Sequence, residues 1–241
     1  MEILHGFKAV GKALWIKNYK TLVLTDLHIG YEEALAKEGF LVPKILAKEM
    51  KQEIKDLLKL KPKIVVINGD LKHEFGEISK QEWFDTLEIL DMLLKDGRRV
   101  ILVKGNHDTI LGPIAKKKNL EIVDFYKLKE ICFLHGHKIF LEVLDKKIKV
   151  LITGHEHPAI SLREGVKQEK FKCFLLGKYK DKKTIILPSF LNFPEGTDIT
   201  KEKMYSPFLR NISDFEIFVV GDKIYKFGKL KEIEKTSNFK N

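Results

Sequence analysis

The chain has 241 residues, of which 44% are hydrophobic and 32% charged, and it contains 16 glycines and 7 prolines. This composition excludes collagen, coiled-coil and low-complexity proteins, and the chain is long enough to bury a hydrophobic core. Lysine and arginine exceed aspartate and glutamate by 44 to 34, which gives a net charge of +10. That excess is compatible with binding nucleic acid or another polyanion, and equally with simple solubility.

The apolar runs are all shorter than the roughly 20 residues that span a bilayer, so no membrane association is expected. The N-terminal sequence lacks the apolar segment and cleavage site of a secretory signal peptide. The two cysteines, Cys132 and Cys173, lie in apolar or alternating runs, which suits reduced thiols in a core. We therefore expect a soluble cytoplasmic protein that folds as one domain over residues 1–241.

Strand-like and helix-like segments alternate along the first half of the chain, which is typical of an α/β fold. A short apolar strand, Thr21–Thr25, stands directly before Asp26, and a second, Ile64–Asn68, precedes Asp70. Between them a helix is predicted to open at Pro43. Apolar residues at helical spacing form its buried face, namely Leu46, Met50, Ile54, Leu57 and Leu58.

A second helix follows, because Ser79 and Glu82 have the spacing of a capping box and Gly97 supplies a stop signal. Its apolar stripe consists of Trp83, Leu87, Leu90 and Leu94. A third strand, Val100–Val103, then leads into Gly105-Asn106-His107-Asp108.

The second half of the chain is richer in strands. Ile131–Leu134 runs into His135-Gly136-His137, and Ile148–Thr153 runs into Gly154-His155-Glu156-His157. Two hairpins are then expected, Phe171–Tyr179 with Lys183–Pro188 and Ile217–Val220 with Lys223–Phe227. These strands, over residues 171–228, are expected to complete the sheets, and the last dozen residues to fray.

Five of the predicted strands end in a polar cluster, and of the eight histidines only His5, expected at the surface, lies away from these clusters. Sites in open α/β sheets gather at the carboxyl ends of strands, so the clusters are expected to converge. Carboxylate, imidazole and amide donors without thiolate suit Mn²⁺, Fe or Zn²⁺. Seven candidate ligands fill two sites if one carboxylate bridges: Asp26, His28, Asp70, Asn106, His135, His155 and His157. Two ions about 3.5–4 Å apart suit phosphoester hydrolysis by a hydroxide held between them.

The clusters resemble the signature of the calcineurin-like metallophosphoesterases, which reads DxH, GD, GNH(D/E), a lone His and GHxH. The chain has Asp26-Leu27-His28, Gly69-Asp70, Gly105-Asn106-His107-Asp108, His135 and Gly154-His155-Glu156-His157 in that order. The resemblance covers about residues 24–158. It implies an α/β fold of four layers, an α/β/β/α sandwich of two mixed β-sheets.

Flanking sequences are similar to one branch of this superfamily, the small archaeal and bacterial phosphoesterases related to the DNA-ligase-associated type. The residues that carry this similarity are Asp26 to Glu32, Gly39 to Pro43, Gly69 to His73 and Leu187 to Phe190.

The resemblance also implies a role for each site residue. Asp26, His28 and His157 would bind one metal ion, Asn106, His135 and His155 a second, and Asp70 would bridge both. His107 would face the scissile phosphate and protonate the leaving oxygen, with Asp108 orienting its imidazole. The nucleophile would be the hydroxide that bridges the metal ions. Mn²⁺ is the expected metal, with Fe, Zn²⁺ and Ni²⁺ as alternatives.

Four further residues adjoin these motifs. His73 and His137 are candidates for lining the site, and each is as readily an ordinary polar loop residue. Lys72 and Lys104 stand next to metal motifs and are placed to attract phosphate, although exposure to solvent is the ordinary interpretation of a lysine.

Three functions are compatible with the sequence. The first is a phosphodiesterase or nuclease acting on DNA or RNA, working with a repair or helicase protein partner. The second is a phosphatase or phosphodiesterase for small molecules such as nucleotides. The third is a non-catalytic scaffold, which the presence of every expected ligand and His107 argues against. The resemblance favours nucleic acid, and the lysines of residues 116–118 and 178–183 lend weak support.

Overall fold

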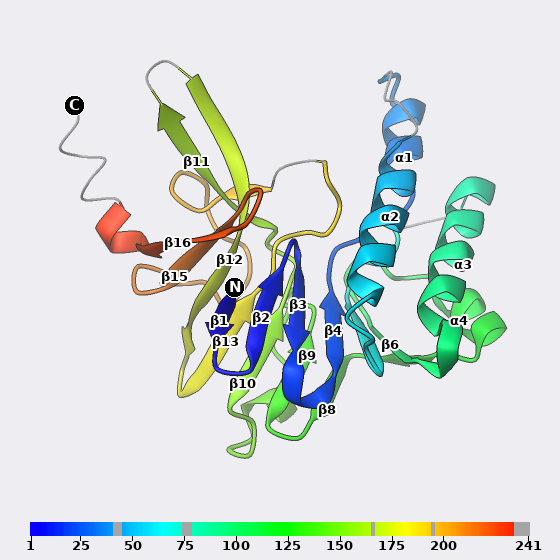
Figure 1. Cartoon of the computed structure of the whole chain (residues 1–241), viewed down its shortest axis with the longest axis horizontal. Coiled ribbons are helices and arrows are strands. Elements are labelled where there is room, and N and C mark those ends of the chain that lie inside the picture. The colour runs from blue at the N-terminus through cyan, green and yellow to red at the C-terminus, as the bar shows by residue number, and fades with distance from the viewer. Residues whose placement is uncertain (41–44, 74–78, 165–166, 194–195, 234–241) are drawn as a thin grey trace.

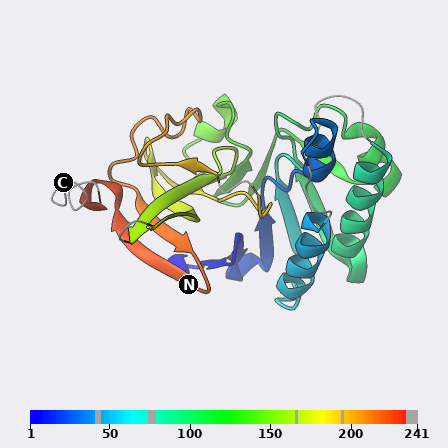
Figure 2. The same ribbon diagram turned by 90° about the horizontal axis from the view of Figure 1, so that it is seen from above.

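The structure, a computed structural model, describes residues 1–40, 45–73, 79–164, 167–193 and 196–233. Two β-sheets pack face to face, and helices cover the outer face of the first sheet (Figures 1 and 2). The fold class expected from the sequence is therefore confirmed.

The first sheet has seven strands that lie in chain order: β1 (Glu2–Leu4), β2 (Phe7–Val10), β3 (Ala13–Ile16), β4 (Thr21–Leu24), β5 (Ile64–Asn68), β6 (Arg99–Val103) and β7 (Glu121–Val123). The strands from β4 to β7 are parallel, as expected where helices connect them. The strands from β1 to β4 are antiparallel, with a 3-10 helix, η1 (Lys17–Tyr19), before β4. The sequence did not predict β1 to β3.

The second sheet has nine strands: β8 (Phe125–Leu128), β9 (Ile131–Leu134), β10 (Val150–Thr153), β11 (Pro158–Glu164), β12 (Lys167–Tyr179), β13 (Lys182–Ile186), β14 (Thr197–Asp198), β15 (Glu216–Val220) and β16 (Ile224–Lys229). Its main path is β14-β11-β12-β13-β10-β9-β8, and β15 pairs with β12 and β16. The strands β9, β10 and β13 are parallel. Both predicted hairpins, β12–β13 and β15–β16, are confirmed, although β12 begins at Lys167 rather than Phe171.

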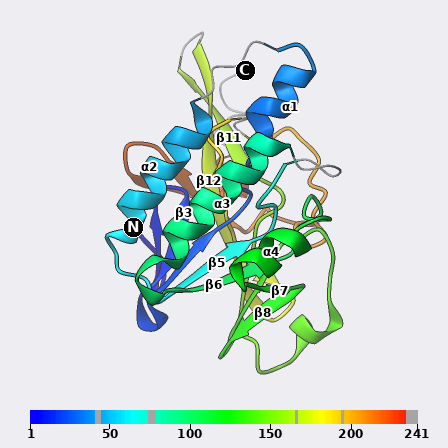
Figure 3. The same cartoon turned by 90° about the vertical axis from the view of Figure 1, so that its right-hand side faces the viewer.

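The helices among the described residues include α1 (Tyr31–Lys37), α2 (Leu46–Leu58), α3 (Lys80–Leu94) and α4 (Gly112–Lys118), with a 3-10 turn, η2 (Lys95–Gly97), after α3. Residues 230–233 are also helical, so the segment expected to fray is ordered at its start. Three of the helices, α2, α3 and α4, lie side by side across the first sheet (Figure 3). Met50, Ile54 and Leu57 are buried on α2, which confirms the apolar spacing, whereas Pro43 lies outside the described residues. Among the described residues, no helix combines the length and apolar character needed to cross a membrane.

One hydrophobic core lies between the sheets, where Val23, Val66 and Ile101 of the first sheet meet Phe133 and Phe174 of the second. A second and larger core lies between the first sheet and its helices. The outer face of the second sheet is covered by the 3-10 helix η3 (Leu141–Leu144) and by the segment 199–215. This layer is therefore built mainly from irregular chain. Both cysteines are buried as expected, and burial raises the pKa of the Cys132 thiol to about 12.

The start of α3 depends on Ser79. Its Oγ accepts a hydrogen bond from the Glu82 N–H at 3.0 Å and its hydroxyl donates to Glu33. We expect Ser79→Ala to lower the free energy of unfolding by about 1 kcal/mol, because a helix N–H loses its acceptor. Urea denaturation measures the change, with Ser79→Thr as the control that keeps a capping hydroxyl. A threonine variant as unstable as the alanine variant would contradict the capping role.

Candidate metal centre

The polar clusters predicted at the strand ends meet at one place, at the junction of the two sheets. They follow β4, β5 and β6 of the first sheet and β9 and β10 of the second. Asn68, the last residue of β5, ties the sheets together here. Its Nδ2 donates hydrogen bonds to the carbonyl oxygens of Leu134 and Ile152, at 3.0 and 3.1 Å.

Most of the expected ligands have an unusual backbone conformation. The residues with φ between 45° and 71° include Asp26, His28, Asp70, His155 and His157. A left-handed conformation costs a residue other than glycine of the order of 1–3 kcal/mol, and it persists only where surrounding contacts hold it. Other left-handed residues, such as Lys61 and Lys129, lie elsewhere in the chain, so it is the grouping of five at the strand ends that sets the centre apart.

A first group of donors consists of Asp26, His28 and His157. The Nε2 of His157 lies 3.3 Å from Asp26 Oδ1 and 3.2 Å from the Nε2 of His28. The other carboxylate oxygen of Asp26 accepts hydrogen bonds from the Thr25 hydroxyl at 2.8 Å and from the His155 N–H at 3.1 Å. The protein thus holds Asp26 mainly through Oδ2, whereas Oδ1 faces the imidazoles and shares the His155 N–H at 3.3 Å.

A second group surrounds His135. Its Nε2 lies 2.8 Å from Asn106 Oδ1, 3.1 Å from His155 Nδ1 and 3.2 Å from Asp70 Oδ2. The same Asp70 oxygen is 3.8 Å from the Nε2 of His28 in the first group. A single carboxylate oxygen therefore faces both groups.

These separations fit metal coordination. Two atoms that each bind one ion at about 2.1 Å, at angles of about 90–110°, lie about 3.0–3.4 Å apart. The distances from His135 Nε2 to Asp70 and His155, and from His157 Nε2 to Asp26 and His28, span 3.1–3.3 Å. The donors are carboxylates and imidazoles, which suit divalent transition metals. The residues present therefore fit divalent metal ions.

The carboxylates at this centre are almost completely buried, with Asp26 0% and Asp70 2% exposed. Burial raises the pKa of the Asp26 carboxyl, but the imidazoles of His157, His135 and His28 outweigh burial and hold that pKa below its ordinary value. Burial also acts upward on the pKa of Asp70, where the hydrogen-bonded His135 outweighs it and lowers the pKa.

The pKa values of two buried imidazoles, those of His28 and His135, are shifted in opposite directions. Burial, reinforced by the charge of His157, lowers the pKa of His28 to about 3, so that its nitrogens are free of a second proton. Burial also acts downward on His135, but Asp70 and Asp26 outweigh it and raise that pKa to about 9. In the metal-free protein, His135 therefore carries the positive charge that partly balances the two carboxylates.

His107 lies against the first group, its ring centroid 4.9 Å from that of His28. Its backbone N–H donates to Asp70 Oδ1 at 2.9 Å, and its Nδ1 bonds to the carbonyl oxygen of His73 at 2.6 Å. A carbonyl only accepts, so Nδ1 carries the proton and Nε2 remains to exchange one with a ligand.

Asp108 does not have the place that the resemblance implied. The His73 carbonyl orients His107 at Nδ1, while the buried Asp108 carboxylate accepts hydrogen bonds from the N–H groups of Gly105 at 2.9 Å, Leu71 at 3.1 Å and Lys72 at 3.4 Å. Backbone N–H groups supply the hydrogen bonds that this buried carboxylate needs. Asp108 thus fastens the loop after β5 to the loop after β6.

Residues 19–221 of the chain match the family described as calcineurin-like phosphoesterase. The match spans well over half of the chain and includes every expected ligand. The chain belongs to the calcineurin-like phosphoesterase family.

Among solved structures, the nuclease MPE of Pseudomonas putida is similar, with a TM-score of 0.66 and 18% identity over 92% of this chain and 100% of that one. The phosphoesterase Yfce of E. coli is 15% identical, with a TM-score of 0.40, over 84% of this chain and 88% of that one. At such identity the first similarity shows a shared fold. No match was found among curated proteins.

Of the remaining histidines of this calcineurin-like phosphoesterase, His73 and His137, whose roles the sequence left open, lie beside the donor groups. His73 is next to His107 and His28, with ring centroids 5.5 and 5.4 Å away. His137 lies beside the second group, 5.3 Å from the His135 ring. His5 is exposed.

Two lysines, Lys72 and Lys182, are buried rather than exposed to solvent as expected, whereas Lys104 is exposed. Lys72 is 0% exposed, and its Nζ has no hydrogen-bond partner among the residues that the structure describes. Lys182 is also buried, because its Nζ donates to the carbonyl oxygens of Asp145 and Ile148. It is thus removed from the basic surface that the sequence suggested.

One supporting segment was recognised in the sequence only through the branch similarity. After β13, the Ser189 hydroxyl donates to the Asp26 carbonyl at 3.0 Å and the Phe190 N–H donates to the Thr25 carbonyl at 2.9 Å. A second support, Glu156, lies inside the GHxH motif and accepts hydrogen bonds from the N–H groups of Tyr205 and Ser206. Neither contact has a local sequence signal, because each joins residues far apart in the chain.

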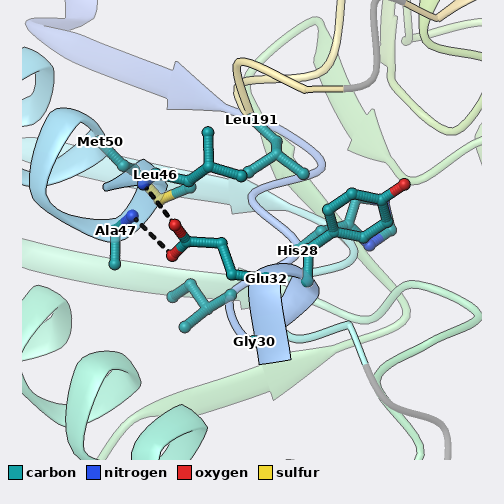
Figure 4. Close-up of a pocket in the computed structure, with 9 residues that line it drawn as sticks. His28, Gly30, Glu32, Leu46, Ala47, Met50 and Leu191 are labelled. Atoms are coloured by element: carbon teal, nitrogen blue, oxygen red, sulfur yellow. Dashed lines mark hydrogen bonds between the residues drawn. The ribbon is translucent and has the colours of Figure 1, made fainter. Parts of the chain in front are cut away.

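A small pocket lies beside His28, where α1 meets α2 (Figure 4). The carboxylate of Glu32 accepts hydrogen bonds from the N–H groups of Leu46 at 2.7 Å and Ala47 at 3.4 Å, so it caps α2 from a neighbouring element. The pocket has a volume of about 10 Å³, about the room of one water molecule. It is a packing feature and too small for a substrate.

Close packing of the motifs predicts the effect of one substitution. A methyl group at Gly154 would overlap the Thr25 hydroxyl and an Asp26 carboxylate oxygen. We expect Gly154→Ala to lower the free energy of unfolding by about 1–3 kcal/mol and to reduce bound metal. Gly112→Ala is the matched control, because a methyl there meets no atom of the described chain within 4 Å. Denaturation and elemental analysis measure both effects, and full metal content in Gly154→Ala would contradict the assignment.

The raised pKa of His135 predicts a pH dependence. Its proton must leave before the imidazole binds an ion, so Mn²⁺ affinity should increase about tenfold per pH unit up to about pH 9. Calorimetry at about pH 7 and pH 8, in buffers of different ionisation enthalpy, measures affinity and counts released protons. An affinity unchanged over this range would contradict the prediction.

The stability of the metal-free fold should instead decrease as the pH rises. Because the folded pKa of about 9 exceeds the ordinary 6.5, His135 stabilises the metal-free fold fully below pH 6.5, and this contribution is lost as the pH rises through 9.

Proposed function

We propose that this protein is a phosphodiesterase with two divalent metal ions, most suitably Mn²⁺, and that its substrate is nucleic acid. The observation that carries the proposal is the position of Asp70 Oδ2, 3.8 Å from His28 Nε2 and 3.2 Å from His135 Nε2. One carboxylate between two donor groups is the arrangement that holds two ions close enough to act on one phosphate. In this proposal Asp26, His28 and His157 hold one ion, Asn106, His135 and His155 hold the other, and Asp70 bridges them.

Bound divalent ions would neutralise the phosphoryl oxygens and lower the pKa of the attacking water. The chain supplies the remaining functions. His107 protonates the leaving oxygen from Nε2, since Nδ1 is held by the His73 carbonyl. Its backbone is fixed by Asp70, so the proton donor and the bridging carboxylate move as one unit.

Nucleic acid is supported by the net charge of +10 and by the structural neighbour from Pseudomonas putida, which is described as a nuclease. The lysine-rich segments offer less positive charge for binding nucleic acid than the number of their lysines suggests. Lys182 is buried among carbonyl groups, and Lys118 is paired with Asp91. The main support for the substrate therefore comes from the similarity and the overall charge.

Hydrolysis of bis(p-nitrophenyl) phosphate by the Mn²⁺-loaded protein tests this function. We expect turnover of this diester to exceed that of p-nitrophenyl phosphate and to disappear after chelation with EDTA, because the water must be activated by metal. Turnover confined to the monoester would contradict the proposal and support the small-molecule phosphatase instead.

The matched variants are His107→Asn and His5→Asn, the second at an exposed histidine. We expect His107→Asn to lower kcat by about 10²–10⁴ while the metal content stays at the wild-type level, since it removes only the proton donor. Loss of metal in this variant would show that His107 is not placed as proposed.

A further inference from the structure

A row of aromatic rings leads from the first donor group to the surface. The ring of His73 lies 5.4 Å from that of His28, and the ring of Tyr31 meets His73 edge-on at 4.7 Å. The ring of Phe193 follows, 6.0 Å from Tyr31. Tyr31 is half-buried, whereas Phe193 is 46% exposed. The row therefore begins at a predicted metal ligand and ends in solvent.

Both outer rings lie beside residues that are held by hydrogen bonds. The N–H of Tyr31, the first residue of α1, donates to the His28 carbonyl at 3.1 Å. Phe193 follows Asn192, whose Nδ2 donates to Glu49 at 2.9 Å and Glu53 at 3.1 Å on α2. A segment that is positioned before a ligand arrives loses less conformational freedom when the ligand binds.

The outer end of the row keeps part of its ring surface exposed. The planes of Tyr31 and Phe193 are tilted by 48°, so the rings are not stacked flat on each other. Phe193, 46% exposed, presents apolar surface to water at this end of the row, and covering that surface is favourable. A flat aromatic group of a bound ligand satisfies this surface better than a polar chain does.

We propose that Tyr31 and Phe193 form a stacking shelf for the base that adjoins the scissile phosphodiester. This inference rests on the proposed function and narrows its substrates to phosphodiesters that carry a nucleobase. Every base has a π-face, so a shelf of this kind binds bases without selecting a sequence. Tyr31 and Phe193 are thus specificity residues, while the donor groups and His107 act on the phosphate.

The test compares two oligonucleotides of equal length and charge, oligodeoxyadenylate and the same backbone with abasic tetrahydrofuran units. We expect the wild-type protein to prefer the adenylate in kcat/KM, and Phe193→Ala and Tyr31→Ala each to reduce that preference about tenfold. Tyr31→Phe keeps the ring and should keep the preference, whereas Phe193→Leu keeps apolar volume without the ring and should lose it. Phe227→Ala, at a phenylalanine of β16 with 39% exposure, is the control.

A binding measurement separates this inference from the proposed function. Fluorescence anisotropy with the labelled oligomers in EDTA reports stacking without turnover. The variants should lose their binding preference for adenylate in the same order as they lose their preference in kcat/KM. Equal binding and equal turnover of adenylate and abasic oligomers would overturn the shelf, even if bis(p-nitrophenyl) phosphate is hydrolysed. Preferential binding of adenylate with no hydrolysis of any diester would instead support the shelf and contradict the phosphodiesterase. Adenylate dinucleotides and longer oligomers, compared in the same assay, distinguish small nucleotides from polymers.

Discussion

Two carboxylates, those of Asp26 and Asp70, are buried where the two sheets meet, and most of the surrounding structure follows from their need for partners. A buried carboxylate is stable only when hydrogen bonds or cations surround it. Asp26 receives the Thr25 hydroxyl and the His155 N–H, and Asp70 receives the His107 N–H. Bringing these N–H groups inward requires the chain to turn immediately after each strand. The left-handed residues at the centre are therefore a structural consequence of burying the two acids, and divalent ions would complete the balance of charge.

The same requirement joins stretches that are far apart in the chain. Ser189 and Phe190 bind the backbone of the Asp26 motif, and Glu156 binds the backbone at Tyr205 and Ser206. The proposed metal ligands and the proposed proton donor thus share one hydrogen-bonded framework. Small residues such as Gly154 occupy points of closest approach within it, where a Cβ would overlap neighbouring atoms.

The sequence predicts the centre well because its information is local. Each of β4, β5, β6, β9 and β10 is an apolar run followed by a polar cluster, and the shared edge of parallel strands brings those clusters together. Other features depend on tertiary contacts that carry no local pattern. The burial of Lys72 and the hydrogen bonds of Asp108 depend on loops from other strands. By contrast, the hairpin of β2 and β3 does have a local signal that was not recognised: Lys8 is the exposed position of an alternating strand, and Gly11 begins a two-residue turn with positive φ.

The division of the centre between two sheets has a consequence for synthesis on the ribosome, where the N-terminal part of a chain emerges first. The first sheet is complete once Val123 has been made, yet His135, His155 and His157 come later, and Phe190 later still. During that interval Asp26 and Asp70 remain hydrated, and the inner face of the first sheet has no second sheet to cover it. The candidate metal-binding geometry is therefore assembled only when residues 135–190 have joined the first sheet, and a nascent chain that stops short of them lacks it.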